Sequence, residues 1–284
     1  MKLYGLLSFS ILLFVSTNIL AYQRDDEVLL KQQKPHLKWM RPTTIIENLQ
    51  WDIQLKNAFY DAYLLQFRDK KIGVDVAKDR ALIARLNKVF RRLQPNSLMA
   101  DLPMEVHLVD DPYVNAVCFP GGGIIFFKGI FDRKEGLIDA NDEDEIAAVM
   151  AHEMSHATLR HGYKQMKNAR SAVMVGEIVA AGLGGSMGET WGGLFQLAYY
   201  PTLGLYMLQY SRSDEAHADL EGLYTMMKAG FNPEKMVAIW KRAAEKNGKS
   251  KHSIFDSHPS NGERVKALTG HLEQIQMHQG GEGK

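Results

Sequence analysis

Hydrophobic side chains recur at three- and four-residue steps along much of the chain, which is the spacing of amphipathic helices. The best-defined helix is predicted over residues 143–161, because Asn141 or Asp142 can cap its start, acidic side chains fill its first turn and Gly162 follows its last turn. The same spacing predicts further helices over residues 45–67, 75–93, 214–227, 233–246 and 260–278.

A strand-like block interrupts the helical pattern. Residues 104–109 alternate, residues 113–119 are rich in β-branched and aromatic side chains, and residues 124–127 continue after a Pro120-Gly121-Gly122-Gly123 turn. We expect these three segments to form a small antiparallel β-meander. The predicted fold class is therefore α+β and mainly α-helical.

The first residues have the pattern of a secretory signal peptide. Met1-Lys2 is followed by an apolar run, and no charged side chain occurs between residues 3 and 23. Cleavage is expected after Ala21, because polar residues dilute the apolar run before it ends. The alternative is an uncleaved anchor helix, since about 20 uncharged residues can just span a bilayer.

The remaining pattern divides the chain into an arm, a domain and a tail. Residues 22–44 are charged and contain two prolines, so we expect an extended N-terminal arm. Residues 45–278 hold all the periodic segments and are predicted to form one domain, and residues 279–284 are a predicted flexible tail.

An apolar, glycine-rich segment covers residues 171–208, where Glu177 and Glu189 are the only charged side chains. Its longest charge-free run, residues 190–208, is about as long as the roughly 18 residues expected of a spanning helix, but it is interrupted by Pro201 and by several glycines. We therefore expect it to lie over the core or to contact a membrane surface.

The charges nearly balance, with 34 Lys and Arg against 33 Asp and Glu, and loss of residues 1–21 would remove one lysine. A basic nucleic-acid-binding surface is therefore not expected for the chain as a whole. The single cysteine, Cys118, cannot form an intramolecular disulfide. Packing and a bound metal are the expected sources of stability.

An HExxH motif lies in the middle of the best-defined helix, from His152 to His156. Two histidines four residues apart share one helix face, so both can bind one Zn²⁺, and Glu153 can then take a proton from a water that the metal activates. The alternative is a charged helix face that carries two histidines without a metal.

A catalytic zinc site needs a third protein ligand. The HExxHxxGxxH solution requires Gly at position 159 and His at 162, but the chain has Leu159 and Gly162 there. A later helix offers Glu215 instead, with Asp219 one turn further on. This spacing allows Glu215 to bind the metal while Asp219 accepts a hydrogen bond from the far nitrogen of a histidine ligand.

Four motifs occur in order between about residue 100 and residue 270. They are Asn115-Ala116 with Pro120-Gly121-Gly122, then His152 to His156, then Ser211-Arg212 with Glu215, Ala218 and Asp219, and finally His258-Pro259 with Arg264. In this order they resemble the M48 family of peptidases, and four ordered motifs are far more specific than HExxH alone.

The resemblance implies a zincin-like (gluzincin) metalloprotease domain with one zinc ion per chain. Its expected ligands are His152, His156 and Glu215, and its expected general base is Glu153. Supporting roles near the metal are expected for Asp219, Arg212 and Arg264.

The resemblance also implies that the strand beginning at Asn115 is an edge strand on which an extended substrate pairs through its backbone. The residues concerned are Asn115, Ala116, Val117 and Cys118. A thiol departs from the aliphatic side chain expected at position 118, and a buried inert thiol is favoured over a reactive one.

His258 is a candidate catalytic residue. In similar proteins a histidine before proline approaches the metal and can stabilise the oxyanion, with the arginine corresponding to Arg264 close by. One alternative is a loop histidine at the start of the last helix. Another is that His258 occupies the open zinc position in a resting form and swings away for catalysis.

These observations predict a zinc endopeptidase that hydrolyses extended or misfolded proteins in cell-envelope quality control. Export, to the bacterial periplasm, is the predicted location, and N-terminal membrane anchoring is the alternative. A non-proteolytic chaperone or assembly factor that retains the zinc site is the competing function, and a membrane-embedded processing enzyme fits poorly because few segments approach a spanning length.

Overall fold

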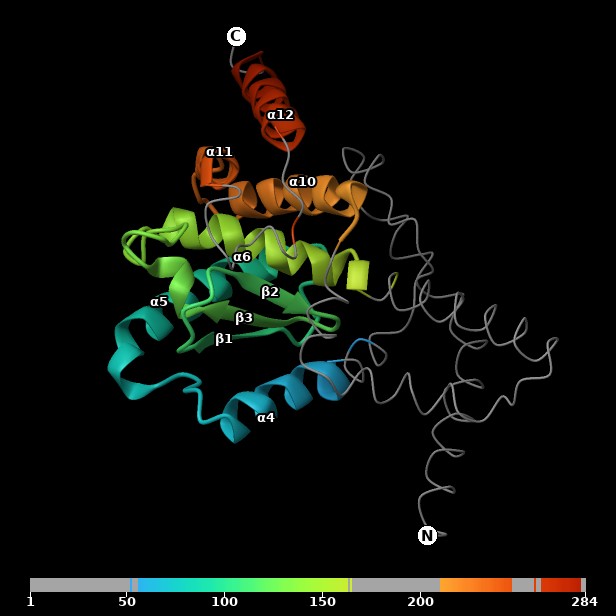
Figure 1. Ribbon diagram of the computed structural model, residues 1–284. Helices are drawn as coiled ribbons and strands as arrows, with labels where there is room; N and C mark the ends of the chain where they lie inside the picture. Colours follow the sequence, from blue (N-terminus) through green and yellow to red (C-terminus); the bar gives the residue numbers. More distant parts are fainter. Residues whose placement is uncertain are drawn as a thin grey trace, which may run out of the picture.

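The computed structural model describes residues 52, 56–162, 164, 210–246, 258 and 262–281 (Figure 1). The predictions of a signal peptide over 1–21, an arm over 22–44 and a membrane-contacting segment over 171–208 lie outside these residues. The described part is mainly helical and carries a three-stranded sheet, as the predicted α+β class requires.

The sheet is mixed. Its strands β1 (Glu105–Val109), β2 (Ala116–Phe119) and β3 (Gly123–Phe127) lie in the order β1-β3-β2. β2 and β3 are antiparallel, joined by a tight turn in which Gly121 and Gly122 have φ angles of +86° and +93°. β1 runs parallel to β3, so the prediction of an all-antiparallel meander was wrong.

Burial of side chains does not by itself explain the strand order. All five residues of β3 are buried, but so are all four residues of the edge strand β2. Both strands have cover on both faces, and β3 differs in having a neighbour on each edge. The alternation along β1 does not show which neighbour it takes, so the pattern alone could not reveal the parallel pair.

Alternate side chains of the strands enter two separate cores. Ile124 and Phe126 join the core beneath the helices of the catalytic motif, whereas Ile125 and Phe127 point to the opposite face. On that second face they meet Tyr60, Tyr63 and Phe67. The sheet is therefore a layer between two sets of helices, with α4 (Ala62–Asp69) on one side and α6 (Glu143–Thr158) on the other (Figure 1).

The helices largely follow the predicted ranges. The segment predicted as helix 45–67 contains a π-helical turn, η2 (Lys56–Asp61), followed by α4 (Ala62–Asp69). The final helix, α12 (Gly262–Gly281), ends three residues beyond the predicted range. The other helices are η3 (Ala77–Asp79), α5 (Arg80–Leu93), η4 (Gln94–Asn96), η5 (Lys128–Phe131), α6 (Glu143–Thr158), α10 (Arg212–Lys228) and α11 (Glu234–Lys246).

Helix α6 begins as expected but ends early. The side chain of Asp142 accepts hydrogen bonds from the backbone N–H groups of Asp144 and Glu145, so Asp142 is the cap. At the other end the helix stops at Thr158, and Arg160 takes a left-handed conformation with φ of +55°. Arg160 also pairs with buried Asp52 at 2.7 Å, a contact that holds this unusual residue in place.

Helix α10 packs directly over α6 (Figure 1). Gly222 allows the close approach, because a Cβ atom there would lie 3.1 Å from the backbone nitrogen of His152. The start of α10 is fixed by a capping box between Ser211 and Asp214. Glu215 therefore enters the interface between the two helices at a defined position.

No helix among the described residues is both long and apolar enough to cross a membrane.

Candidate metal centre

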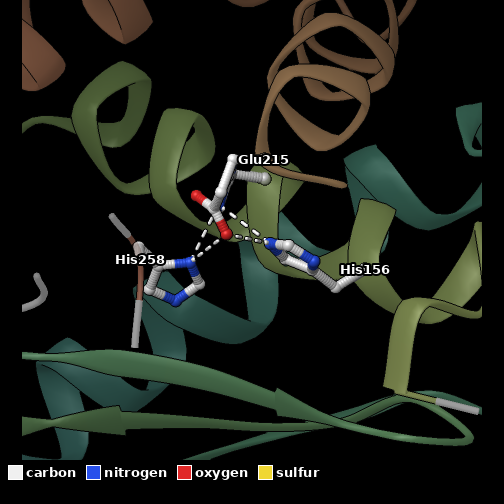
Figure 2. A group of neighbouring side chains, drawn as sticks. His156, Glu215 and His258 are labelled. Carbon is white, nitrogen blue, oxygen red and sulfur yellow. Dashed lines mark hydrogen bonds and ion pairs between the residues drawn. The ribbon is translucent and has the colours of Figure 1, made fainter. Parts of the chain in front are cut away.

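Four buried side chains that can bind a metal converge between α6 and α10. His152 and His156 come from α6, Glu215 comes from α10, and His258 precedes α12. One ligand atom from each lies within 4.8 Å of the others. Figure 2 shows the Glu215 carboxylate pointing between the rings of His156 and His258.

The distances within this group are short. The Nε2 atoms of His152 and His156 are 3.0 Å apart, and they lie 3.5 and 3.4 Å from the two carboxylate oxygens of Glu215. Nδ1 of His258 is 3.0 Å from Glu215 Oε1 and 3.3 Å from His152 Nε2. Three imidazoles and a carboxylate thus direct atoms able to bind a cation toward one point.

The charges around this point favour a divalent cation. Glu153, Glu215 and Asp219 are buried carboxylates, and Arg264 is the buried guanidinium among them. When all three carboxylates are ionised, two negative charges remain uncompensated within the described part of the site. A divalent cation would balance them when the imidazoles are neutral, as metal ligands must be. Without a metal, burial lowers the pKa of His152 but Asp219 and Glu215 outweigh it and raise that pKa to about 9, so a proton on His152 supplies part of the counter-charge.

Arg264 and Asp219 support the group from one side. Nδ1 of His152 lies 2.9 Å from Asp219 Oδ1, and Arg264 contacts both oxygens of Asp219 at 2.7 and 2.8 Å. Arg264 also lies 2.7 Å from Glu215 Oε2 and stacks over the ring of Trp240. The guanidinium therefore holds the carboxylates of Glu215 and Asp219 next to the candidate ligands, a placement that fits a supporting role.

Burial and neighbouring positive charges shift the pKa values of Glu215 and Asp219 in opposite directions. Burial alone would raise the pKa of Glu215, but His258 and Arg264 hold that pKa well below its usual range. The pKa of Asp219 is lowered in the same way, with Arg264 as the main opposing influence. Both groups therefore favour the ionised form that a metal ligand or its partner requires.

Glu153 has a different environment. Burial raises the pKa of its carboxyl, and the charges of His258 and His152 only partly oppose this. Nε2 of His258 lies 3.2 Å from Oε1, yet neither carboxylate oxygen has an aligned hydrogen bond within the described residues. A buried carboxylate with a raised pKa and free acceptor atoms is suited to accept a proton.

His156 has neighbours that the sequence did not reveal. The ring of Tyr210 stacks on it, with 3.7 Å between ring centroids and 13° between planes. Its Nδ1 lies 2.9 Å from Nδ1 of His161. The spacing from 156 to 161 is wrong for one continuous helix, but α6 ends at Thr158 and the turn at Arg160 brings His161 back.

Arg212 lies outside the cluster of four converging side chains. It lies on the exposed first turn of α10, and no contact between it and the four converging residues is found among the described residues. Its predicted supporting role therefore has no geometric basis here, although the neighbouring Ser211 and Asp214 form the capping box.

The candidate substrate strand β2 is the outer strand of the described sheet. The bond from the Phe127 N–H to the Asn115 carbonyl makes the pairs at 116 and 118 non-hydrogen-bonded, so the backbone groups of Ala116 and Cys118 point away from β3. Two of these outward backbone groups already form hydrogen bonds. Asn115 Oδ1 accepts a hydrogen bond from the Ala116 N–H, and the Tyr210 hydroxyl donates one to the Cys118 carbonyl.

Cys118 and its strand are deeply buried. Each β2 residue is at most 3% exposed, so a peptide could pair along this edge only after local opening. Burial also raises the pKa of the Cys118 thiol well above its ordinary value. This environment favours the inert thiol over the reactive one.

An HExxH helix packed between a small sheet and a second helix that supplies an acidic residue is the arrangement of a metalloprotease. A model of peptidase family M48 matches residues 81–272, more than half of the chain. The chain belongs to this family, which confirms the resemblance found in its motifs.

Named relatives agree with this assignment. The chain is 31% identical over 194 residues to the mitochondrial metalloendopeptidase OMA1 of Schizosaccharomyces pombe, covering 68% of this chain and 53% of the relative. It is 26% identical over 191 residues to the beta-barrel assembly-enhancing protease of Escherichia coli (62% and 35%), and 27% identical over 184 residues to the metalloprotease YcaL of the same species (65% and 67%). The chain thus spans about half the length of the fungal relative.

Proposed function

We propose that the chain is a zinc-dependent endopeptidase with His152, His156 and Glu215 as the ligands of one zinc ion. The observation that carries this proposal is the convergence of their ligand atoms: the Nε2 atoms of His152 and His156 are 3.0 Å apart, and they lie 3.5 Å from Glu215 Oε2 and 3.4 Å from Glu215 Oε1, respectively. Bonds of about 2.0–2.1 Å directed to the corners of a tetrahedron place neighbouring ligand atoms about 3.3–3.4 Å apart. The residues therefore fit zinc in both chemistry and spacing, with a zincin-like site as the result.

A zinc ion held there would supply a Lewis acid that polarises the scissile carbonyl and lowers the pKa of water. In the proposed reaction Glu153 accepts a proton from the attacking water and delivers it to the leaving amine. Asp219 keeps His152 in the tautomer that presents Nε2, and Arg264 keeps Glu215 and Asp219 ionised.

His258 is proposed to regulate access to this centre. Its Nδ1 lies 3.0 Å from Glu215 Oε1 and 3.3 Å from His152 Nε2, so it would compete with water for a metal held there, while its Nε2 lies 3.2 Å from Glu153 Oε1. This placement supports the resting form in which His258 must leave before substrate and water can enter. After release, the same imidazole is within reach of the oxyanion.

The role of His258 is testable with His258→Ala. If His258 blocks the centre, cleavage of an unfolded protein should rise, because the substitution opens the fourth position without removing a required ligand. A fall in activity with zinc content unchanged would instead assign His258 to oxyanion stabilisation. Zinc content and initial cleavage rates of both proteins should be measured together.

The proposed substrates are extended or misfolded proteins of the cell envelope. Once local opening frees the outward backbone groups of β2, this strand would pair with peptides whose own backbone groups are free rather than with folded chains. The name of the Escherichia coli relative, a beta-barrel assembly-enhancing protease, supports an envelope role. Export to the bacterial periplasm, with an N-terminal anchor as the alternative, and contact of residues 171–208 with a membrane belong to this proposal.

A single comparison tests hydrolysis. Wild type and Glu153→Gln should bind equal amounts of zinc, because Glu153 is not a proposed ligand, but only wild type should cleave casein. The Gln side chain matches Glu in size and cannot accept the proton. If both proteins bind zinc and neither cleaves, a non-proteolytic assembly factor becomes the better description; if both cleave equally, the role of Glu153 is wrong.

A further inference from the structure

The two histidines of the HExxH motif are supported in different ways on the side facing away from the cluster. His152 Nδ1 lies 2.9 Å from the carboxylate of Asp219, whereas His156 Nδ1 lies 2.9 Å from a second imidazole, that of His161. His161 is 4% exposed and does not belong to the converging group. A buried histidine in this place calls for an explanation, because histidine is otherwise found mostly at partly exposed positions.

The arrangement of the rings determines which histidine donates in the hydrogen bond between His156 Nδ1 and His161 Nδ1. His156 presents Nε2 to the cluster, 3.0 Å from His152 Nε2, so Nε2 carries the lone pair that binds a metal. Its proton must then be on Nδ1, which donates to Nδ1 of His161. His161 accepts there and carries its own proton on Nε2.

That second proton also has a suitable neighbour. His161 Nε2 lies 3.8 Å from Asp214 Oδ1, which is longer than a hydrogen bond but favourable for an N–H facing a carboxylate. Asp214 is itself held by Lys164 at 2.7 Å and by the Ser211 hydroxyl at 2.6 Å. The chain of contacts therefore runs from His156 through His161 to a fixed carboxylate.

Asp214 also belongs to α10, where its side chain closes the capping box and the next residue is Glu215. The group that faces His161 is thus built into the same helical turn as the candidate acidic ligand. His161 in turn connects this turn to the end of α6. The orientation of His156 and the position of Glu215 are linked through these few contacts.

We propose that His161 is a positioning residue that fixes the tautomer and ring orientation of His156 as a metal ligand. The proposal rests on the proposed function only in taking His156 as a ligand. Residues that hydrogen-bond metal-binding histidines commonly change metal affinity by about 10–100-fold when removed.

Two substitutions at one position separate hydrogen bonding from packing. His161→Leu removes the acceptor, whereas His161→Asn retains an oxygen close to the position of Nδ1. His217→Leu is the matched control, because His217 lies on α10 with its ring 6.4 Å from that of His161 and is not one of the converging residues.

The measurements should be made on the full chain, using zinc affinity from competition with a chromophoric chelator and the visible spectrum of the Co²⁺-loaded protein. We expect His161→Leu to weaken zinc binding about 10–100-fold and to shift the Co²⁺ bands, while His161→Asn and His217→Leu stay within about threefold of wild type. Thermal unfolding of the metal-free proteins checks folding.

Several results would overturn the proposal. These are wild-type affinity and spectrum in His161→Leu, an Asn variant as impaired as the Leu variant, or a wild-type chain that binds neither metal. If His161→Leu fails to fold, the Asn variant alone decides, by retaining or losing affinity. A wild-type chain that binds zinc but does not cleave casein contradicts only the proposed hydrolysis.

Discussion

Glu221 is a buried acid outside the candidate metal centre whose surroundings oppose its ionisation. It is 0% exposed, its Oε1 accepts a hydrogen bond from Thr225 at 3.2 Å, and its Oε2 has no hydrogen-bond partner within the described residues. Burial raises its pKa to about 7, against the weaker opposing effect of Lys228. The folded protein therefore retains this proton at pH values where the unfolded chain has lost it.

This predicts a loss of stability as the pH rises. Below pH 4.5 both states are protonated; above it the free energy of unfolding falls by about 1.4 kcal/mol per pH unit until about pH 7, a total of roughly 3 kcal/mol. Glu221→Gln should remove this part of the slope and stabilise the protein at pH 8. Denaturant unfolding at pH 5 and pH 8 measures it, with exposed Glu273→Gln as the control; equal slopes in Glu221→Gln and wild type would contradict the prediction.

Some residues of the candidate site could be predicted from the sequence and others could not. The spacing of His152, His156, Glu215 and Asp219 was readable because each pair lies four residues apart on one regular helix. His161 is out of phase with the spacing of a third histidine ligand, and its contact with His156 could not be predicted, since that contact depends on a left-handed turn at an arginine rather than at a glycine. Such a turn leaves no signal in the periodicity of the chain.

At the scale of elements, the contact between α6 and α10 determines whether the candidate ligands meet. Gly222 permits it, with the backbone carbonyl carbon of Ala151 and the backbone nitrogen of His152 each 3.1 Å from where a Cβ would be. Larger side chains at position 222 must separate the helices. Because backbone atoms cannot move aside as a flexible side chain can, the effect should extend to Glu215.

Gly222→Leu should therefore lower both the free energy of unfolding, by about 1–3 kcal/mol or more, and the affinity for zinc. Gly270→Leu is the matched control, because a Cβ on α12 at that position meets nothing within 4 Å and Leu favours the helix over Gly. Thermal unfolding with and without zinc measures both effects. Similar behaviour of the two variants would show that the interhelical approach is not tight.

The elements were easier to predict than their arrangement. Apolar spacing located α5, α6, α10 and α11 to within a few residues, because each has one side that packs against the core. The partner of β1 was not predictable, because the alternation along β1 fits pairing with either β2 or β3, and both of these strands are fully buried.

For the whole molecule, the candidate metal centre connects parts of the chain that are far apart in sequence. A ligand that binds only the folded state stabilises it according to its concentration, by about 2.7 kcal/mol at one hundred times the dissociation constant. In the proposed zinc-bound form the ion would also balance the charge of the buried carboxylates, so its removal should lower stability further.

A chelator should therefore lower the unfolding temperature, and added zinc should restore it in proportion to the logarithm of its concentration. Glu215→Gln should abolish most of the response to zinc because it removes a charged ligand. Scanning calorimetry over a zinc titration provides the measurement, with Mg²⁺ as the comparison ion. A response of the Gln variant equal to that of wild type would exclude Glu215 as a ligand.

The aromatic side chains on the far face of the sheet show that the folded domain begins before the residues that the family model matches. The family match begins at residue 81, whereas Tyr60, Tyr63 and Phe67 cover the apolar side chains of Ile125 and Phe127 from an earlier segment. A fragment that begins at residue 81 would expose the apolar face of the sheet to water and should aggregate. The region that the family model matches therefore depends for its packing on a preceding segment that the model does not match, and a truncated protein must keep both.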